Sequence, residues 1–312
     1  MSRDAPSPPD PLAARRRRWA EDMARLAGIC DPAVIDAFAA VRREDFLPPP
    51  PWTVLGARRR VTSDPTDLLD DVLVALDPSR GVNNGSPSLH AAWIAALGIR
   101  PGDRIVHLGA GTGFYTAILA RLAGPAGRVE AVEIDPALVR IAAPALAALG
   151  PGFAPVEVIV ADATTRPTAT ADRIYVNFGI AAPARPWIER LALGGRLILP
   201  LCVPIDGGAA WRSGEGWGLR IERRAEGWTA RALDACEFVF AEGAATASPP
   251  AVQRLREAFR RGGIHRVRSL RLGPVSSARD DWYVGDDWAL GCEPPPEPGR
   301  DPPCSPPATS PA

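Results

Sequence analysis

Residues 104–135 constrain the fold more than any other stretch, because they combine two short apolar runs with three closely spaced glycines. The first run, around Val106, shows no polar alternation, which is typical of a strand buried on both faces of a parallel sheet. The glycines follow at once, Thr112 is expected to cap the next helix, and residues 114–122 keep apolar side chains at helical spacing. A second apolar run at 129–134 completes a strand–turn–helix–strand unit, which is half of a doubly wound nucleotide-binding sheet.

The glycine turn and one acidic residue form a candidate cofactor site. A side chain at Gly109 or Gly111 would keep a ligand away from the backbone, and the start of the following helix favours a negative group. Glu133 lies near the end of the second strand, where a carboxylate can accept hydrogen bonds from two ribose hydroxyls. With Gly113 the spacing is G-x-G-x-G, the arrangement seen in S-adenosylmethionine enzymes. A turn without a ligand is one alternative; an NAD-dependent oxidoreductase is another, but it would favour G-x-G-x-x-G.

The composition is that of an ordinary globular protein without a strong electrostatic field. Of 312 residues, 46% are hydrophobic and 23% are charged, and the formal net charge is zero, so nothing favours nucleic acid or an anionic membrane as a partner. The five cysteines are scattered and only three histidines are present, so we expect no metal site and a cytoplasmic location. No apolar run reaches the ~20 residues of a membrane span, and the arginines at 15–18 lack the apolar core of a signal peptide behind them.

The N-terminal part, residues 12–98, is predicted to be a mainly helical segment. Asp31 followed by Pro32 is typical of a helix start, and the four prolines before Trp52 favour an extended link. The expected elements are a disordered N-terminus at 1–11, helices at 12–28 and 31–41, an extended link at 41–52, a short helix or strand at 67–76, and a polar turn leading into a helix at 81–98.

Strands and helices alternate after Glu133, which predicts a mostly parallel sheet. Asp162 and Asn177 follow two of the strands, and ligands of such sheets lie at the carboxyl strand ends. The expected elements are a helix at 136–149, strands at 156–160 and 174–176, a helix at 186–193, and a fifth strand at 197–201.

The C-terminal part is predicted to leave this pattern. An antiparallel hairpin at 217–223 and 229–240 ends a cofactor-binding domain at 99–241, and a small extension occupies 242–290. The expected elements of the extension are a helix at 251–261, a strand at 266–272 and a hairpin at 281–290, followed by a disordered Pro-rich tail at 291–312. Trp282 and Trp288 are expected to pack the extension onto the core, and the extension is a candidate cover for the site.

Residues 23–201 resemble the protein-L-isoaspartate O-methyltransferase family, within the class I S-adenosylmethionine methyltransferases. Three stretches carry the resemblance: VIDAFAAVRREDFLP at 34–48, the Gly109 loop with Glu133, and Asp162 followed by ADRIYVNFG and LALGGRLILPL. The resemblance implies a Rossmann-like doubly wound fold and S-adenosylmethionine as cofactor. It places Gly109, Ala110 and Gly111 against the methionine part of the cofactor, Glu133 on the ribose and Asp162 on the adenine amino group. The cofactor residues expected together are Gly109, Ala110, Gly111, Gly113, Glu133, Asp162 and Asn177.

The acceptor loop departs from the family pattern. The family typically carries T-I-S-x-P there, whereas this chain has NNGSP at 83–87, which places Gly85 where the serine belongs. Ser86 could supply the hydroxyl from the neighbouring position, and Asn83 and Asn84 would help to position the acceptor. His90 is similar to a histidine of some members, and it titrates near neutrality. The candidate catalytic residues are Ser86, Asn84 and His90.

We therefore predict an S-adenosylmethionine-dependent O-methyltransferase that methylates a carboxylate of a peptide or protein. Such an acceptor is ionised at neutral pH and needs no general base, whereas a hydroxyl or amine would need one. The alternatives are a small-molecule methyltransferase, a cofactor-binding homologue without isoaspartyl activity and, less favoured, the NAD-dependent oxidoreductase. The oligomeric state is left open.

Overall fold

The computed structural model describes residues 10–56, 58–166, 169–205, 213–241, 247–274 and 280–295. The disorder predicted for 1–11 and 291–312 falls almost entirely outside these ranges. The predicted disorder extends too far at both margins. Asp10 is ordered, because it accepts hydrogen bonds from the Leu12 N–H and the Arg16 guanidinium, and Gly291 is the last residue of the last strand.

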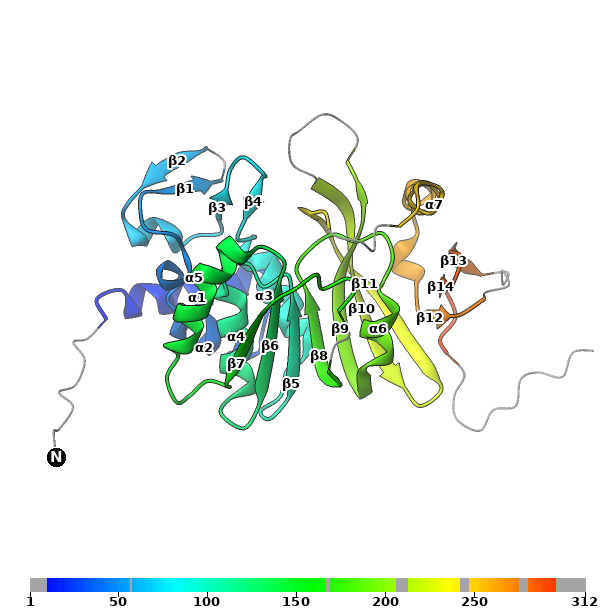
Figure 1. The fold of residues 1–312 in the computed structure, drawn as a ribbon, viewed down its shortest axis with the longest axis horizontal. Helices are drawn as coiled ribbons and strands as arrows, with labels where there is room; N and C mark the ends of the chain where they lie inside the picture. The colour runs from blue at the N-terminus through cyan, green and yellow to red at the C-terminus, as the bar shows by residue number, and fades with distance from the viewer. Residues whose placement is uncertain are drawn as a thin grey trace, which may run out of the picture.

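A ten-stranded sheet runs through the molecule, in the order β13-β14-β12-β11-β10-β9-β8-β5-β6-β7 (Figure 1). The five strands from β9 to β7 are parallel, and every pairing beyond β9 is antiparallel. The first group comprises β5 (Arg104–Leu108), β6 (Arg128–Glu133), β7 (Val156–Val160), β8 (Ala171–Val176) and β9 (Leu191–Pro204). The chain order reverses between β5 and β8, so the predicted doubly wound, mostly parallel sheet is confirmed.

The unit predicted from residues 104–135 forms β5, α4 (Phe114–Ala123) and β6. All but the first residue of β5 are buried, as expected for a strand covered on both faces. The helix cap is a correction: Gly113 is the N-cap residue, with φ +94°, and Thr112 is buried one residue earlier. The turn enters the helix through a left-handed conformation that glycine adopts without steric cost, so no side-chain cap forms.

Two apolar cores lie on opposite faces of the parallel strands. On one face Tyr175 and Ile198 pack with Trp93 and Phe114, and on the other Ile174 and Leu197 pack with Trp187. The first face is covered by α1 (Ala13–Leu26), α2 (Pro32–Ala40), α3 (Pro87–Leu97), α4 and α5 (Pro136–Ala147), and the second by α6 (Arg185–Glu189) and α7 (Pro249–Arg261). Helix α6 is shorter than predicted, because β9 already begins at Leu191.

The segment at 12–98 is only partly helical, which corrects the prediction. Residues 52–83 form a small antiparallel sheet in the order β2-β1-β3-β4, with its own core around Trp52, Val54 and Val74 (Figure 1). Its strands are β1 (Trp52–Leu55), β2 (Arg60–Thr62), β3 (Leu73–Asp77) and β4 (Val82–Asn83), and the 3-10 turns η1 (Arg43–Phe46) and η2 (Pro65–Leu68) precede or interrupt them. This sheet lies above the carboxyl ends of the parallel strands and forms one wall of the site.

The C-terminal extension continues the central sheet. Trp282 and Trp288 are buried in the same apolar cluster as Ile174 and Leu197 of the central sheet, so the predicted packing of the extension onto the core is confirmed. Within the extension, Trp282 also donates its indole N–H to Gly262 O at 2.8 Å. The extension follows the hairpin of β10 (Ser213–Arg224) and β11 (Gly227–Val239), and it comprises α7, η3 (Ile264–Arg266), β12 (Ser269–Leu272), β13 (Asp281–Val284) and β14 (Trp288–Gly291). Within the described ranges, no helix is long and apolar enough to span a membrane.

Candidate functional site

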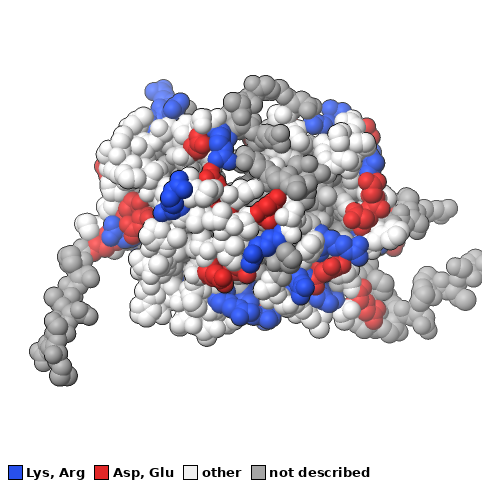
Figure 2. All heavy atoms as spheres, viewed as in Figure 1, with Lys and Arg blue, Asp and Glu red and all other residues white. Residues whose placement is uncertain are grey.

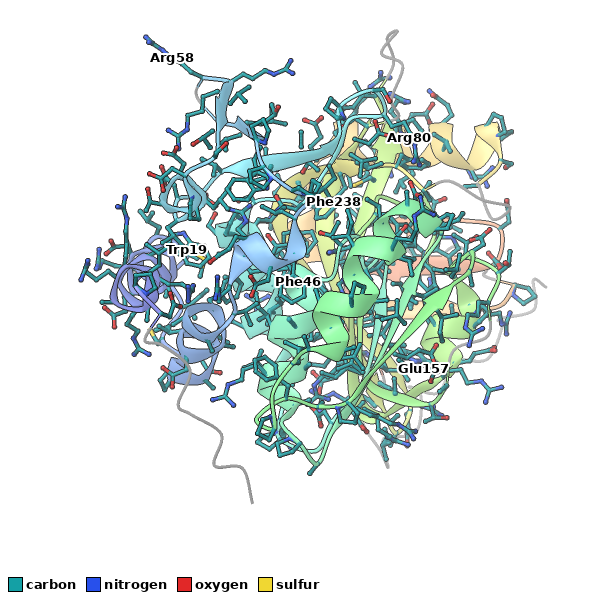
Figure 3. The ribbon with its side chains drawn as sticks, turned by 60° about the vertical axis from the view of Figure 1, so that its left-hand side comes forward. Trp19, Phe46, Arg58, Arg80, Glu157 and Phe238 are labelled. Atoms are coloured by element: carbon teal, nitrogen blue, oxygen red, sulfur yellow. The ribbon has the colours of Figure 1, made fainter. Side chains whose placement is uncertain are left out.

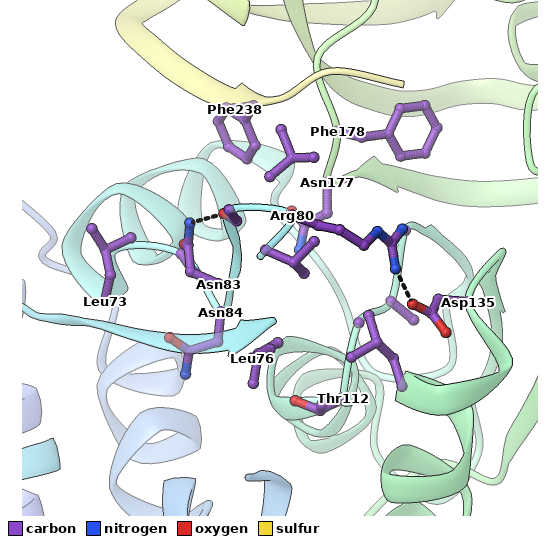
Figure 4. Close-up of a pocket in the computed structure, with 18 of the residues that line it drawn as sticks. Leu73, Leu76, Arg80, Asn83, Asn84, Thr112, Asp135, Asn177, Phe178 and Phe238 are labelled. Atoms are coloured by element: carbon purple, nitrogen blue, oxygen red, sulfur yellow. Dashed lines mark hydrogen bonds and ion pairs between the residues drawn. The ribbon is translucent and has the colours of Figure 1, made fainter. Parts of the chain in front are cut away.

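A pocket of about 700 Å³ opens between the small sheet and the carboxyl ends of β5, β6 and β8 (Figure 4). It brings together every residue that the sequence singled out for the cofactor and the acceptor: Asn84, Ser86, His90, Gly109, Ala110, Gly111, Gly113, Glu133, Asp162 and Asn177. None of the described residues of the extension, 247–274 and 280–290, lines this pocket, so these residues do not form the expected cover. On the face in Figure 2, acidic and basic side chains are interspersed.

At the glycine turn a ligand can come close to the backbone, but the N–H groups at its start already form hydrogen bonds within the protein. The N–H groups of Gly109 and Ala110 both donate to Val132 O, at 2.8 and 3.1 Å. A Cβ on Gly109, where φ is +75°, would lie 2.7 Å from the Phe178 ring, whereas a Cβ on Gly111 would meet nothing within 4 Å. The backbone at Gly111 therefore faces open space in the pocket, where a ligand can approach it.

Glu133 is fixed by the turn that it faces. One carboxylate oxygen accepts the Gly111 N–H at 2.7 Å and the other accepts the Asp135 N–H at 3.0 Å. Burial raises the pKa of Glu133, and these N–H groups oppose that rise by favouring the charged form. Each oxygen keeps a lone pair beyond the bond that it accepts, so the carboxylate can receive further donors from the pocket.

Asp162 and Asn177 follow the carboxyl ends of β7 and β8, the strands that lie beside β6 and β5 in the sheet. Asp162 Oδ1 accepts the N–H and the hydroxyl of Thr164, at 2.8 and 2.6 Å. The Asn177 N–H donates to Leu108 O, but its side-chain Oδ1 is buried without a hydrogen-bond partner among the described residues. A buried carbonyl oxygen without a donor is costly, so this atom is suited to a donor group of a ligand.

An ion pair between Arg80 and Asp135 joins the small sheet to the start of α5 across the pocket (Figure 4). Asp135 also accepts the Ala137 N–H at 2.7 Å as the N-cap of α5. Burial opposes the charged form of Asp135, but the Ala137 N–H and the Arg80 guanidinium outweigh it and lower the pKa. Sequence reasoning missed this pair, because the Asp135-Pro136 dipeptide signals only a helix start and Arg80 precedes it by 55 residues.

In the acceptor loop, three of the expected polar side chains bond to the protein itself. Asn83 Oδ1 accepts the Gly85 N–H at 2.9 Å, which holds the turn. Asn84 Oδ1 accepts from both Arg43 and the Val74 N–H at 2.9 Å. Ser86 Oγ donates to Asp71 at 2.9 Å, beside the start of α3. The catalytic roles of Asn84 and Ser86 stay predictions, since these contacts support the loop and do not test an acceptor.

His90 lies beneath the loop in an aromatic enclosure. Its Nδ1 is 2.7 Å from the Tyr175 hydroxyl, and its ring stacks on Tyr115 with centroids 3.8 Å apart. Burial, helped by His107 and Arg43, lowers the pKa of His90 to about 3, so the expected titration of His90 near neutrality is wrong. His107 in β5 is fully buried, with Nδ1 2.8 Å from the Thr116 hydroxyl.

The chain matches a family model over residues 20–206, that of the protein-L-isoaspartate(D-aspartate) O-methyltransferases. A protein-L-isoaspartate O-methyltransferase of Aeropyrum pernix is 31% identical over 197 residues, which cover 62% of this chain and 70% of the relative. A second such enzyme, from Rhodopseudomonas palustris, is 34% identical over 190 residues, which cover 61% of this chain and 70% of the relative. The family-model match extends from α1 to β9 and so includes the acceptor loop.

Two solved structures share the fold. A protein-L-isoaspartate O-methyltransferase aligns with a TM-score of 0.58 at 18% identity, covering 88% of this chain and 87% of the other. A Plasmodium falciparum protein-L-isoaspartate O-methyltransferase, solved in complex with S-adenosyl-L-homocysteine, aligns with a TM-score of 0.54 at 18% identity, covering 73% of this chain and 98% of the other.

Proposed function

The chain belongs to the protein-L-isoaspartate(D-aspartate) O-methyltransferase family, and we propose that it methylates a carboxylate of a peptide or protein, with the isoaspartyl residue as the first substrate to test. It is an S-adenosylmethionine-dependent methyltransferase, as the family is. The NAD-dependent alternative has no support in the comparisons. The absence of nucleic-acid and membrane partners, the cytoplasmic location and the 99–241 domain boundaries stay predictions.

The pocket fits S-adenosylmethionine in two respects. The carboxylate of Glu133 is held at the end of β6 with lone pairs to spare, which suits ribose hydroxyls, and the buried Asn177 Oδ1 requires a donor. The backbone of Gly109, Ala110 and Gly111 would contact the methionine part. Asp162 would receive the adenine amino group. This assignment carries the proposal, because the family match and the pocket meet at the same residues.

When bound, S-adenosylmethionine supplies a sulfonium methyl group that a carboxylate oxygen can take, the new O–C bond forming as the S–C bond breaks, with the bonding electrons left on sulfur and no proton transferred. The protein has to hold the acceptor oxygen near the methyl group and exclude water. Because holding two reactants in the right orientation can by itself accelerate a reaction greatly, this positioning is the main contribution of the protein to the rate. The loop at 83–87, the small sheet and Phe238 enclose the part of the pocket beyond the glycine turn.

The test is a methyl-transfer assay with labelled S-adenosylmethionine on an isoaspartyl peptide and its aspartyl twin. Methyl esters release methanol in mild base, whereas ethers and methylamines do not, so the volatile label identifies a carboxylate acceptor. We expect base-labile label on the isoaspartyl peptide only. Base-stable label on any acceptor, or no label while calorimetry still detects S-adenosylhomocysteine binding, would contradict the proposal.

A further inference from the structure

His90 and Gly85 are sterically complementary. A Cβ built on Gly85 would lie 2.2 Å from His90 Nε2, far inside van der Waals contact. The imidazole therefore occupies the place where a side chain at position 85 would begin, and the two cannot coexist without rearrangement. Both residues line the pocket, so the edge of the imidazole takes the place of a residue-85 side chain at the acceptor loop.

The orientation of the imidazole is fixed from several sides. Tyr115 stacks on one face of the ring with an interplanar angle of 22°, and the Phe238 ring meets it edge-on at 5.8 Å. The Tyr175 hydroxyl bonds to Nδ1, and only 2% of the His90 surface is exposed. The ring cannot flip or swing away without breaking these contacts, so Nε2 stays at the Gly85 position.

The hydrogen bond to Tyr175 selects one tautomer of His90. Tyr175 is fully buried, and His90 Nδ1 is the one hydrogen-bond partner of its hydroxyl within the described residues. Burial raises the pKa of Tyr175 well above its usual value, so the hydroxyl keeps its proton and must donate it. A buried O–H without an acceptor would cost about 1–3 kcal/mol, so Nδ1 accepts and the ring proton resides on Nε2.

From this geometry we infer that the Nε2–H of His90 holds the acceptor carboxylate, in place of a side chain at position 85. The inference rests on the proposed function and narrows it to acceptors that are already anionic. His90 Nε2 has no hydrogen-bond partner among the described residues, so its proton is available to one carboxylate oxygen while the other attacks. An Nε2 that carries a proton cannot accept one, so hydroxyl and amine acceptors, which need a general base, are not served.

The tautomer can be measured without activity. Nitrogen-15 NMR of histidine-labelled protein separates Nε2–H from Nδ1–H rings, and the chain has only three histidines to assign. We expect His90 to be an Nε2–H tautomer and its Nδ1–H population to rise in Tyr175→Phe. An Nδ1–H tautomer in the parent protein would overturn the inference.

Kinetics test the role itself. His90→Leu is expected to reduce kcat/KM for the acceptor by about ten- to a hundredfold, the range for one lost hydrogen bond to a charged group. The affinity for S-adenosylhomocysteine should remain unchanged. The double variant Gly85→Ser with His90→Ala has room for the serine and should recover part of this loss, although a serine at φ +73° carries some strain.

The pH dependence of kcat/KM shows whether His90 acts as a hydrogen-bond donor or as a general base. The titratable and charged groups around His90 are Tyr115, Tyr175, His107 and Arg43, from four different elements. Because His90 stays neutral across the pH range of the assay, kcat/KM should show no ionisation near pH 6.5. Such an ionisation, or base-labile product formed equally fast by His90→Leu, would overturn this inference while leaving the proposed function intact. Base-stable product would instead overturn the proposed function.

Discussion

Asn84 Oδ1 accepts a 2.9 Å hydrogen bond from Nη2 of Arg43, a guanidinium that is fully buried and has carbonyl and amide oxygens, not carboxylates, as its hydrogen-bond acceptors. The same oxygen accepts the Val74 N–H, so one amide joins the turn after α2 to the small sheet beside the pocket. Burial lowers the pKa of Arg43, and Tyr115 and Asp71 offset only part of this effect.

This arrangement predicts that Asn84 tolerates aspartate and not leucine. Asn84→Leu would leave two buried donors unpaired, at a cost of about 2–4 kcal/mol in the free energy of unfolding. Asn84→Asp keeps both bonds, and it loses nothing at Nδ2, which is buried without a partner among the described residues. Urea unfolding at pH 7 should find the aspartate variant within about 1 kcal/mol of the parent. Equal destabilisation of the two variants would contradict this account.

Gly111 and Gly124 form a matched pair for testing the cofactor turn. Both have left-handed backbones, with φ of +58° and +63°, and a Cβ on either would meet nothing within 4 Å. Replacement by alanine should cost each about 1 kcal/mol of stability through backbone strain. Only Gly111 lines the pocket, so only Gly111→Ala should weaken S-adenosylhomocysteine binding in calorimetry. Equal affinities in both variants would place the ligand elsewhere.

The Arg80–Asp135 pair predicts a kinetic effect on the cofactor. An ion pair whose Arg80 side chain is partly exposed contributes about 0–1 kcal/mol, so Arg80→Gln should leave the melting temperature nearly unchanged. It should accelerate release of S-adenosylhomocysteine in stopped-flow measurements, because the pair joins the two walls of the pocket. Arg58→Gln is the control, since Arg58 projects away from the body of the protein (Figure 3). An equal effect of both variants would assign the change to net charge alone.

The acceptor-loop candidates came from the family resemblance. Local patterns predicted the parallel sheet, the glycine turn and the acidic strand end, because each is encoded within a few residues. They failed where backbone geometry decided the outcome, as at Gly113, which caps α4 in place of Thr112. They also missed the small sheet, whose strands are two to five residues long and gain stability only by pairing with one another.

The contacts that define the acceptor side could not be predicted from spacing. His90 meets Tyr175 across 85 residues, Asn84 meets Arg43 across 41, and Ser86 meets Asp71 across 15. Each contact depends on how α3 and the small sheet pack onto the parallel strands. Family resemblance located the loop, but the replacement of a residue-85 side chain by an imidazole is a property of the packed structure.

The two buried histidines predict that acid destabilises the protein in a range where most carboxylates stay charged. Burial lowers the pKa of both His90 and His107 to about 3, whereas an unfolded histidine titrates near ~6.5. Below pH ~6.5 the two histidines bind protons in the unfolded chain but stay neutral in the folded protein. Stability is therefore complete above pH ~7 and falls as the pH drops from ~6.5 towards ~3, by about 1.4 kcal/mol per pH unit for each histidine.

Urea unfolding of the parent protein and of His107→Leu between pH 7.5 and 4.5 checks this prediction. Glu133, whose pKa is raised by burial, works in the opposite direction in both proteins, so the comparison between them is more informative than either slope alone. The variant lacks one of the two buried histidines. The histidine contribution to the slope of its unfolding free energy against pH should therefore be about half of that in the parent. The same slope in both would mean that His107 accepts a proton without unfolding, because water reaches the ring through local opening.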